Sequence, residues 1–196
     1  MSATSGAPSG ERGRRQATLT YGARNPEKPE LAALAVATAS RTATIADAIR
    51  GARVVLLAVP SASIAELLLT DGVADLLNRK AVIDATNNVR SPVMNSAEAI
   101  LAASPGAHYF RAFNTLGWEV LAEPVLAGVS SDMFFCGPDG EERTVVEALV
   151  ADVGLRPIWV GGPDEVNTID GVLRIWLTLV MKQHHSRHMA FKLHED

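Results

Sequence analysis

The sequence predicts an α/β protein built on a parallel sheet with helices on both of its faces. Three observations support this class. Short apolar runs of strand length recur along the chain, most clearly at residues 53–59 and 81–86. Stretches with apolar residues at helical spacing lie between these runs. No internal repeat or long linker interrupts the alternation, and strands that alternate with helices in this way form parallel sheets.

The amino-terminal elements are predicted from a change in composition. Residues 1–16 are rich in Ser, Gly and Arg, and we expect them to be disordered because they have little apolar surface to bury. A β-prone segment begins at Ala17. Pro26 is expected to open a helix, with Asn25 as its N-cap.

The rest of the chain continues the alternation. Pro60 ends the run 53–59, which is apolar throughout, as a strand covered on both faces should be. Gly154 is expected to cap the carboxyl end of the helix predicted at 141–153. In order, we predict a strand at 53–59, a helix around 64–68, a strand at 81–86, a helix at 93–103, a strand at 108–113, a helix at 116–121, a strand at 133–136, a helix at 141–153, a strand at 157–160 and a helical segment from 163 to the end.

Composition narrows the classes of function. The 196 residues are 47% apolar and 20% charged, as in ordinary globular proteins, and the net charge is −4. Basic residues do not cluster outside the first 16 residues, so we expect no nucleic-acid partner. No run is long and apolar enough to cross a membrane, and a single cysteine excludes a disulfide framework within the chain. We therefore expect a cytoplasmic location and no membrane association.

Candidate ligand-binding residues are sought in the loops that follow the strands, because parallel sheets bind ligands at their carboxyl ends. The loop at 22–26 carries Arg24, and Lys28 follows one helical turn later. An acidic residue that would bind the ribose hydroxyls of NAD is missing there. A guanidinium and an ammonium group instead suit the 2′-phosphate of NADP. The alternative is that both side chains are merely solvated.

Three further loops each allow two interpretations. Val59 and Pro60 could let a flat apolar ring lie against the chain, or Pro60 could simply end a strand. Asn87 could bind a carboxamide or a ribose, or form a turn. Asn114 and Thr115 could bind substrate or cap the helix at 116–121.

Four segments in this order and spacing resemble the family of NADPH-dependent coenzyme F-420 reductases. They are YGARNPEK, LLAVP, VIDATN and RAFNTLG, and the carboxyl-terminal DGVLRIWLTLVMKQHHSRHMAFKL is also similar to the closing helices of the family. The resemblance covers residues 17–193. It implies a Rossmann-like doubly wound parallel sheet at 17–162, a short helical C-terminal extension at 163–196, and an altered amino-terminal segment at 1–16.

The resemblance also implies hydride transfer between NADPH and a deazaflavin, coenzyme F-420, with no obligatory catalytic side chain. Ala23 departs from the family pattern, in which a hydroxyl residue often occupies that position. A homodimer that pairs through its closing helices is implied as well. The residues assigned to the cofactor are Gly22, Arg24, Lys28, Val59, Pro60 and Asn87, and those assigned to the substrate are Phe113, Asn114 and Thr115.

The amino terminus departs furthest from the family. Gly6, Gly10 and Gly13 do not have the spacing G-x-G-x-x-G, and no strand precedes them. The first strand of such a fold lies between the second and the fourth, so its loss would leave two strand edges unpaired. We therefore expect weak or no NADPH binding. Alternative functions are reduction of a metal chelate or quinone, and a non-catalytic module that dimerises or senses nucleotides.

Three features of the sequence lie outside these loops: a pair of histidines, a single cysteine and an apolar segment near the carboxyl terminus. His184 and His188 are four residues apart and could share one helix face, although we expect no metal site. Cys136 lies in an apolar strand and is expected to be buried rather than reactive. The segment 171–181 is apolar nearly all round and must be covered, either by the core of the monomer or by a second subunit.

Overall fold

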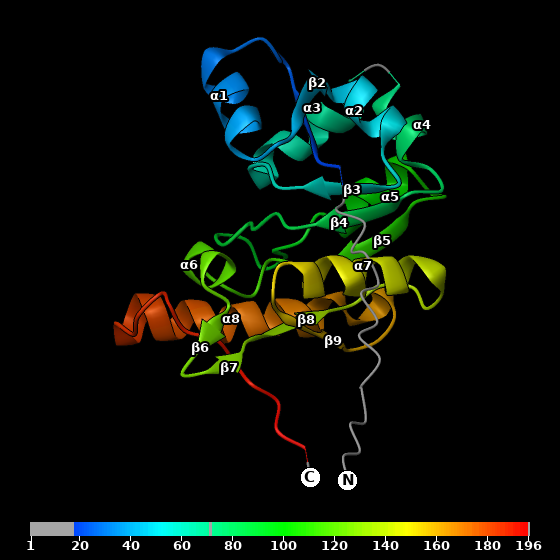
Figure 1. The fold of residues 1–196 in the computed structure, drawn as a ribbon. Helices are drawn as coiled ribbons and strands as arrows, with labels where there is room; N and C mark the ends of the chain where they lie inside the picture. The colour runs from blue at the N-terminus through cyan, green and yellow to red at the C-terminus, as the bar shows by residue number, and fades with distance from the viewer. Residues whose placement is uncertain (1–17, 71, 196) are drawn as a thin grey trace, which may run out of the picture. The chain divides into compact units, whose positions relative to one another are not determined.

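A computed structural model describes residues 18–70 and 72–195 (Figure 1). The chain forms two compact units, one reaching to Ala48 and the other comprising Ile49–Asp196. Residues 1–16, with the expected disorder and the three glycines, lie outside the described residues. The predicted domain boundary between residues 162 and 163 stays a prediction.

The first unit is a parallel β-α-β arrangement. Strand β1 (Thr20–Ala23) pairs in parallel with β2 (Arg41–Thr44), and helix α1 (Pro29–Ala37) connects them. Helix α2 (Ile45–Gly51) follows β2 directly and carries the boundary between the units. Neither β2 nor α2 was predicted, because the sequence RTAT has no apolar run and α2 is only seven residues long.

The start of α1 corrects a prediction. Pro29, rather than Pro26, opens the helix, and Lys28 occupies the N-cap position. The side chain of Asn25 caps no helix; its Oδ1 accepts a hydrogen bond from the backbone N–H of Glu27 at 3.2 Å. Asparagine here forms a local turn, which competes with helix formation at this position.

The second unit holds a parallel three-stranded sheet in the order β3-β4-β5, with the predicted strands slightly shortened. A second parallel pair, β8 and β9, adjoins it through a bridge between Arg111 and Cys136, which exchange both backbone hydrogen bonds at 2.9 and 3.2 Å. The strands are β3 (Val54–Leu57), β4 (Ala81–Asp84), β5 (His108–Arg111), β8 (Asp132–Phe135) and β9 (Arg156–Trp159), with a small hairpin of β6 (Val125–Leu126) and β7 (Val129–Ser130).

The helices of the second unit follow the predicted alternation. A short helix, α4, was not predicted, and it immediately follows α3 in the same crossover. Gly154, with φ of +92°, ends α7 as predicted. The helices are α3 (Ile64–Leu69), α4 (Val73–Leu77), α5 (Ala97–Ala103), α6 (Trp118–Ala122), α7 (Glu141–Asp152) and α8 (Val166–Gln183), with 3₁₀ turns η1 (Ser61–Ser63) and η2 (Pro163–Glu165).

The core of the second unit is built on these strands. Ile83, Phe110 and Phe135 are buried together, one from each of three strands, and Val146 of α7 covers them. Cys136 is fully buried beside them, as predicted, and burial raises the pKa of its thiol to about 12. Among the described residues, no helix is long and apolar enough to cross a membrane.

The carboxyl-terminal segment corrects another prediction. Helix α8 ends at Gln183, and His184 has the left-handed φ of +59°, so His184 and His188 do not share a helix face. The chain then runs without regular structure as far as residue 195 (Figure 1). It is fixed to the buried carboxylate of Asp132, which accepts hydrogen bonds from Lys192 Nζ and from the backbone N–H of Leu193, each 2.7 Å long.

Strand pairing also bears on the departure at the amino terminus. Within residues 18–70 and 72–195, β1 pairs only with β2. Strand β3 pairs only with β4 in the same part of the chain, and β4 in turn pairs with β5. The strand that a dinucleotide fold places between its second and fourth strands is not among these elements. Within the described part of the chain, β1 and β3 therefore each keep one unpaired edge.

Candidate functional site

The loop after β1 lines an open hollow of about 570 Å³ within the first unit. Arg24 and Lys28 both line it, so the structure brings these two predicted residues together. Its other lining residues are Ala23, Asn25, Glu30, Leu31 and Leu34. A hollow with two cations at the carboxyl end of a parallel strand suits an anionic group.

Lys28 occupies an electrostatically unusual position. It is the N-cap of α1, and its carbonyl oxygen accepts hydrogen bonds from the backbone N–H groups of Leu31 and Ala32, both 3.0 Å. The amino-terminal end of a helix carries a partial positive charge, which disfavours a lysine and favours a bound anion. Glu30 in the first turn offsets part of this charge.

Gly22 has a packing role in the first unit. A Cβ at this position would lie 3.1 Å from the Cβ of Ala48 and 3.4 Å from the Cα of Ile45. The glycine therefore lets α2 approach β1 closely. The structure gives this reason for Gly22, and its assignment to the cofactor stays a prediction.

In the second unit, the loop after β3 is exposed. Val59 is 37% exposed, and the carbonyl oxygen of Pro60 accepts the hydrogen bond from Ser63 N–H that starts η1. Pro60 thus ends the strand and begins a turn of helix. Because Val59 and Pro60 leave an apolar surface open at this end of the sheet, they remain available to a flat ring.

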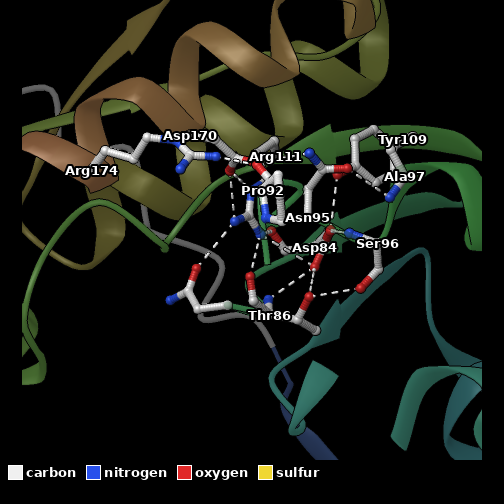
Figure 2. Close-up of polar contacts among 11 residues, drawn as sticks. Asp84, Thr86, Pro92, Asn95, Ser96, Ala97, Tyr109, Arg111, Asp170 and Arg174 are labelled. Carbon is white, nitrogen blue, oxygen red and sulfur yellow. Dashed lines mark hydrogen bonds and ion pairs between the residues drawn. The ribbon is translucent and has the colours of Figure 1, made fainter. Parts of the chain in front are cut away.

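Sequence reasoning missed a buried polar network at the carboxyl ends of β4 and β5, drawn in Figure 2. Asp84, the last residue of β4, is fully buried. Each of its carboxylate oxygens accepts two hydrogen bonds, so the carboxylate is fully occupied. Oδ1 accepts from the backbone N–H and the hydroxyl of Thr86 at 2.9 and 2.7 Å, and Oδ2 accepts from Ser96 N–H at 2.7 Å and from the Tyr109 hydroxyl at 2.9 Å.

Asp84 therefore fixes both ends of the loop 84–96. Burial, and then the neighbouring Asp84 charge, raise the pKa of Tyr109 far above its ordinary value, so this hydroxyl stays a donor. A carboxylate with four donors is held as a structural anchor rather than offered to a ligand.

Arg111, the last residue of β5, is also fully buried and lies at the centre of the network. Asp170 of α8 forms an ion pair with it, with Oδ1 2.8 Å from Nη2 and 3.0 Å from Nε. The other oxygen of Asp170 accepts from Asn95 Nδ2 at 2.8 Å. The one available signal in the sequence was an arginine within the otherwise apolar segment YFRAF, since a buried arginine must be paired.

The network reaches two predicted residues. Asn87 is exposed, and its Oδ1 accepts a hydrogen bond from Arg111 Nη2 at 3.1 Å. Asn114 is buried, and its amide matches its neighbours when the oxygen faces Arg111, 3.2 Å from Nη2 and from Nε. The structure therefore brings Asn87 and Asn114 together around one guanidinium group.

Phe113 and Thr115 flank Asn114 in the loop after β5. Phe113 has a φ of +60°, a strained conformation for an aromatic residue, and strain of this kind often marks a ligand-binding loop. Thr115 is buried, with its hydroxyl 3.9 Å from Met133 Sδ. Neither Asn114 nor Thr115 caps α6, whose N-cap is Gly117 without a side-chain hydrogen bond, so the capping alternative is wrong.

The geometry defines a mixed α/β protein with parallel sheets and polar or cationic loops at the carboxyl ends of its strands, which is the Rossmann-like class. The first unit holds Gly22, Arg24 and Lys28, and the second holds the other predicted residues. Residues 7–88 match the model of the family "NADP oxidoreductase, coenzyme F-420-dependent". The resemblance seen in the sequence is thereby confirmed over that segment, and NADP is the nucleotide of the matched family.

Solved structures agree on the fold. The chain is similar to a candidate F-420-dependent NADP reductase from Arthrobacter sp. FB24, with 23% identity, a TM-score of 0.72, and coverage of 90% of this chain and 88% of that one. A hypothetical protein from Sinorhizobium meliloti is 28% identical, with a TM-score of 0.57 over 71% of this chain and 70% of that chain. A pyrroline-5-carboxylate reductase from Coxiella burnetii is 16% identical, with a TM-score of 0.51 over 83% of this chain and 61% of that chain.

Proposed function

We propose that this protein binds NADP(H) and transfers hydride between it and a deazaflavin such as coenzyme F-420. The observation that carries the proposal is the pairing of Arg24 and Lys28 in one hollow at the carboxyl end of β1. The match of residues 7–88 to a family of NADP oxidoreductases supports it.

The chain's own residues would bind and orient the two rings. Arg24 and Lys28 would hold the 2′-phosphate, while Val59, Pro60 and Asn87 would contact the nicotinamide end. Phe113, Asn114 and Thr115 would lie near the acceptor, although the burial of Asn114 and Thr115 leaves Phe113 as the more accessible of the three. The bound nicotinamide supplies the hydride chemistry, so no catalytic side chain is needed.

The test is a titration of the protein with NADPH and NADH followed by nucleotide fluorescence. We expect a preference for NADPH with an affinity weaker than low micromolar, because Gly6, Gly10 and Gly13 lack the family spacing. Arg24→Ala and Lys28→Ala should each reduce the preference for NADPH over NADH by about tenfold, as expected for one charge-assisted hydrogen bond. Lys182→Ala, which removes an exposed cation from α8, is the matched control and should leave the preference unchanged.

Hydride transfer is tested separately, by following F-420 absorbance with NADPH in excess. Reduction of F-420 but not of ferric chelates or quinones supports the deazaflavin as acceptor. Reduction of a chelate or quinone alone would identify another NADPH-dependent reductase. Equal binding of NADPH and NADH, or binding unaffected by both substitutions, would contradict the role of Arg24 and Lys28.

A second candidate is a non-catalytic module that dimerises or senses nucleotides. It is favoured by the absence of G-x-G-x-x-G spacing and by the unpaired edges of β1 and β3 in the described part of the chain. NADPH binding without hydride transfer to any of the three acceptors would support it.

We also propose that α8 pairs two subunits. Leu173 and Trp176 are buried within the unit, whereas Ile175 and Met181 are 54% and 67% exposed on the solvent side of the helix. Ile175→Glu should shift a dimer towards monomer in sedimentation, and Val153→Glu at the end of α7 serves as the control. A monomer at tens of micromolar for the unmodified protein would contradict this proposal.

A further inference from the structure

The side chain of Asn87 is exposed, yet one end of its amide is already occupied. Its Oδ1 accepts a hydrogen bond from Arg111 Nη2 at 3.1 Å. An amide carries its acceptor and its two donors on opposite branches, so the Nδ2 group lies on the side away from the guanidinium. The orientation of this amide decides which ligand atoms it can recognise.

Arg111 permits only this orientation. Its five N–H donors all have acceptors, and none of its atoms can accept a hydrogen bond. Turning the amide of Asn87 would place its NH₂ against another donor. Nε and one Nη2 donor reach Asp170 Oδ1, the second Nη2 donor reaches Asn87, and Nη1 reaches the carbonyl oxygens of Asp84 at 3.1 Å and Thr86 at 2.5 Å. The Asn114 oxygen shares the Nε and Nη2 donors.

Arg111 is itself fixed from α8. Asp170 holds two of its nitrogens with one oxygen, and its other oxygen holds Asn95 from the loop after β4. All of these contacts are within the second unit. The buried ion pair therefore determines the orientation of the exposed Asn87 amide in the loop after β4.

We propose that Asp170 and Arg111 are positioning residues that fix Asn87 as a hydrogen-bond donor to an acceptor oxygen of the ligand. The proposal rests on the proposed function, in which a nicotinamide lies at this edge of the sheet. The recognised group is then the carbonyl oxygen of the carboxamide rather than its NH₂ group. Asn87 then offers its two Nδ2 donors to a ligand acceptor, whereas one of the two lone pairs of its Oδ1 is already used by Arg111.

The test compares NADP⁺ with two analogues by ligand-observed NMR titration. Thionicotinamide-NADP⁺ replaces the carbonyl oxygen with sulfur, a weaker acceptor, and 3-acetylpyridine-NADP⁺ keeps the carbonyl but lacks the NH₂ group. The unmodified protein should bind the thio analogue about 3- to 10-fold more weakly than NADP⁺, the factor of one neutral hydrogen bond. It should bind the acetyl analogue as tightly as NADP⁺.

Variants separate recognition from positioning. Asn87→Ala should remove the discrimination against the thio analogue, and Asn88→Ala, at the next exposed position, should leave it unchanged. Arg111→Lys keeps the charge but cannot hold Asp170 and Asn87 with one planar fork, so it should also reduce the discrimination. If Arg111→Lys does not fold, Asp170→Asn is used in its place. This substitution keeps the shape of the side chain and should reduce the discrimination in the same way.

Adenosine 2′,5′-bisphosphate distinguishes the two possible failures. It carries the 2′-phosphate without nicotinamide, so every second-unit variant should bind it like the unmodified protein. If the unmodified protein binds neither this compound nor NADP⁺, the proposed function is wrong and the present proposal fails with it. If it binds both but discriminates against the acetyl analogue instead of the thio analogue, or if Arg111→Lys and Asp170→Asn keep full discrimination, the positioning role alone is overturned.

Discussion

The attachment of the carboxyl-terminal segment gives a prediction whose magnitude follows from the structure. The carboxylate of Asp132 is fully buried at the start of β8. Arg156 donates to both of its oxygens at 2.7 Å, and Lys192 and the backbone of Leu193 add one bond each at 2.7 Å. Asp132→Asn keeps the shape of the side chain but replaces one acceptor oxygen with a donor that faces these donors.

Burial of Asp132 opposes its charge, but the hydrogen bonds from Arg156, Lys192 and Leu193 outweigh this effect and lower its pKa from 3.8 to about 2. This difference corresponds to roughly 2 kcal/mol of unfolding free energy. Because the pKa in the folded state is depressed, the contribution is present in full above the unfolded pKa. It is lost as the pH falls towards 2, and about half should remain at pH 3.

Urea unfolding followed by tryptophan fluorescence measures this contribution in the second unit, because Trp118, Trp159 and Trp176 all lie there. At pH 7, Asp132→Asn should lower the unfolding free energy by about 2 kcal/mol, and the difference from the unmodified protein should shrink between pH 5 and pH 3. Asp152→Asn, at the exposed end of α7, is the matched control and should change it by less than about 0.5 kcal/mol. A difference that stays constant with pH, or that grows as the pH falls, would refute this reasoning.

Three further predictions concern the buried interior of the second unit. Tyr109→Phe leaves one oxygen of Asp84 short of a donor, so thermal or urea unfolding should show a loss of about 1–3 kcal/mol; an unchanged stability would mean that another group fills the vacancy. Cys136 should react with a thiol reagent at pH 8 only after denaturant is added, since burial raises its pKa to about 12, and rapid reaction of the native protein would contradict its burial. Gly137→Ala would place a Cβ 2.1 Å from the ring of Phe110, so a drop of several kcal/mol is expected in the same unfolding assay, whereas near-native stability would show that the ring can move away.

Periodic features of the chain could be read from its sequence. The apolar runs 53–59 and 81–86 predicted β3 and β4, and the helical spacing of Val146 and Val150 predicted α7, because a buried strand or helix face must repeat its apolar residues at the period of the backbone. The family resemblance carried by YGARNPEK and VIDATN was also visible there. Short polar elements escaped this reasoning. Strand β2 is stabilised by its pairing with β1, and no local sequence pattern predicts this pairing.

The polar interior was decided by the tertiary structure. Arg111 and Asp170 are 59 residues apart, and only the packing of α8 against the carboxyl ends of β4 and β5 makes them an ion pair. That packing turns the amide of Asn87 and buries Asn114, two outcomes that the residue types left open. The carboxyl-terminal segment was also decided by the tertiary structure, because α8 ends at Gln183 and Lys192 and Leu193 beyond it bind Asp132, which is far away in the sequence. The spacing of apolar residues in the sequence indicates strands and helices, because it follows the period of the backbone. The partner of a buried charge depends instead on which distant segments the fold brings together.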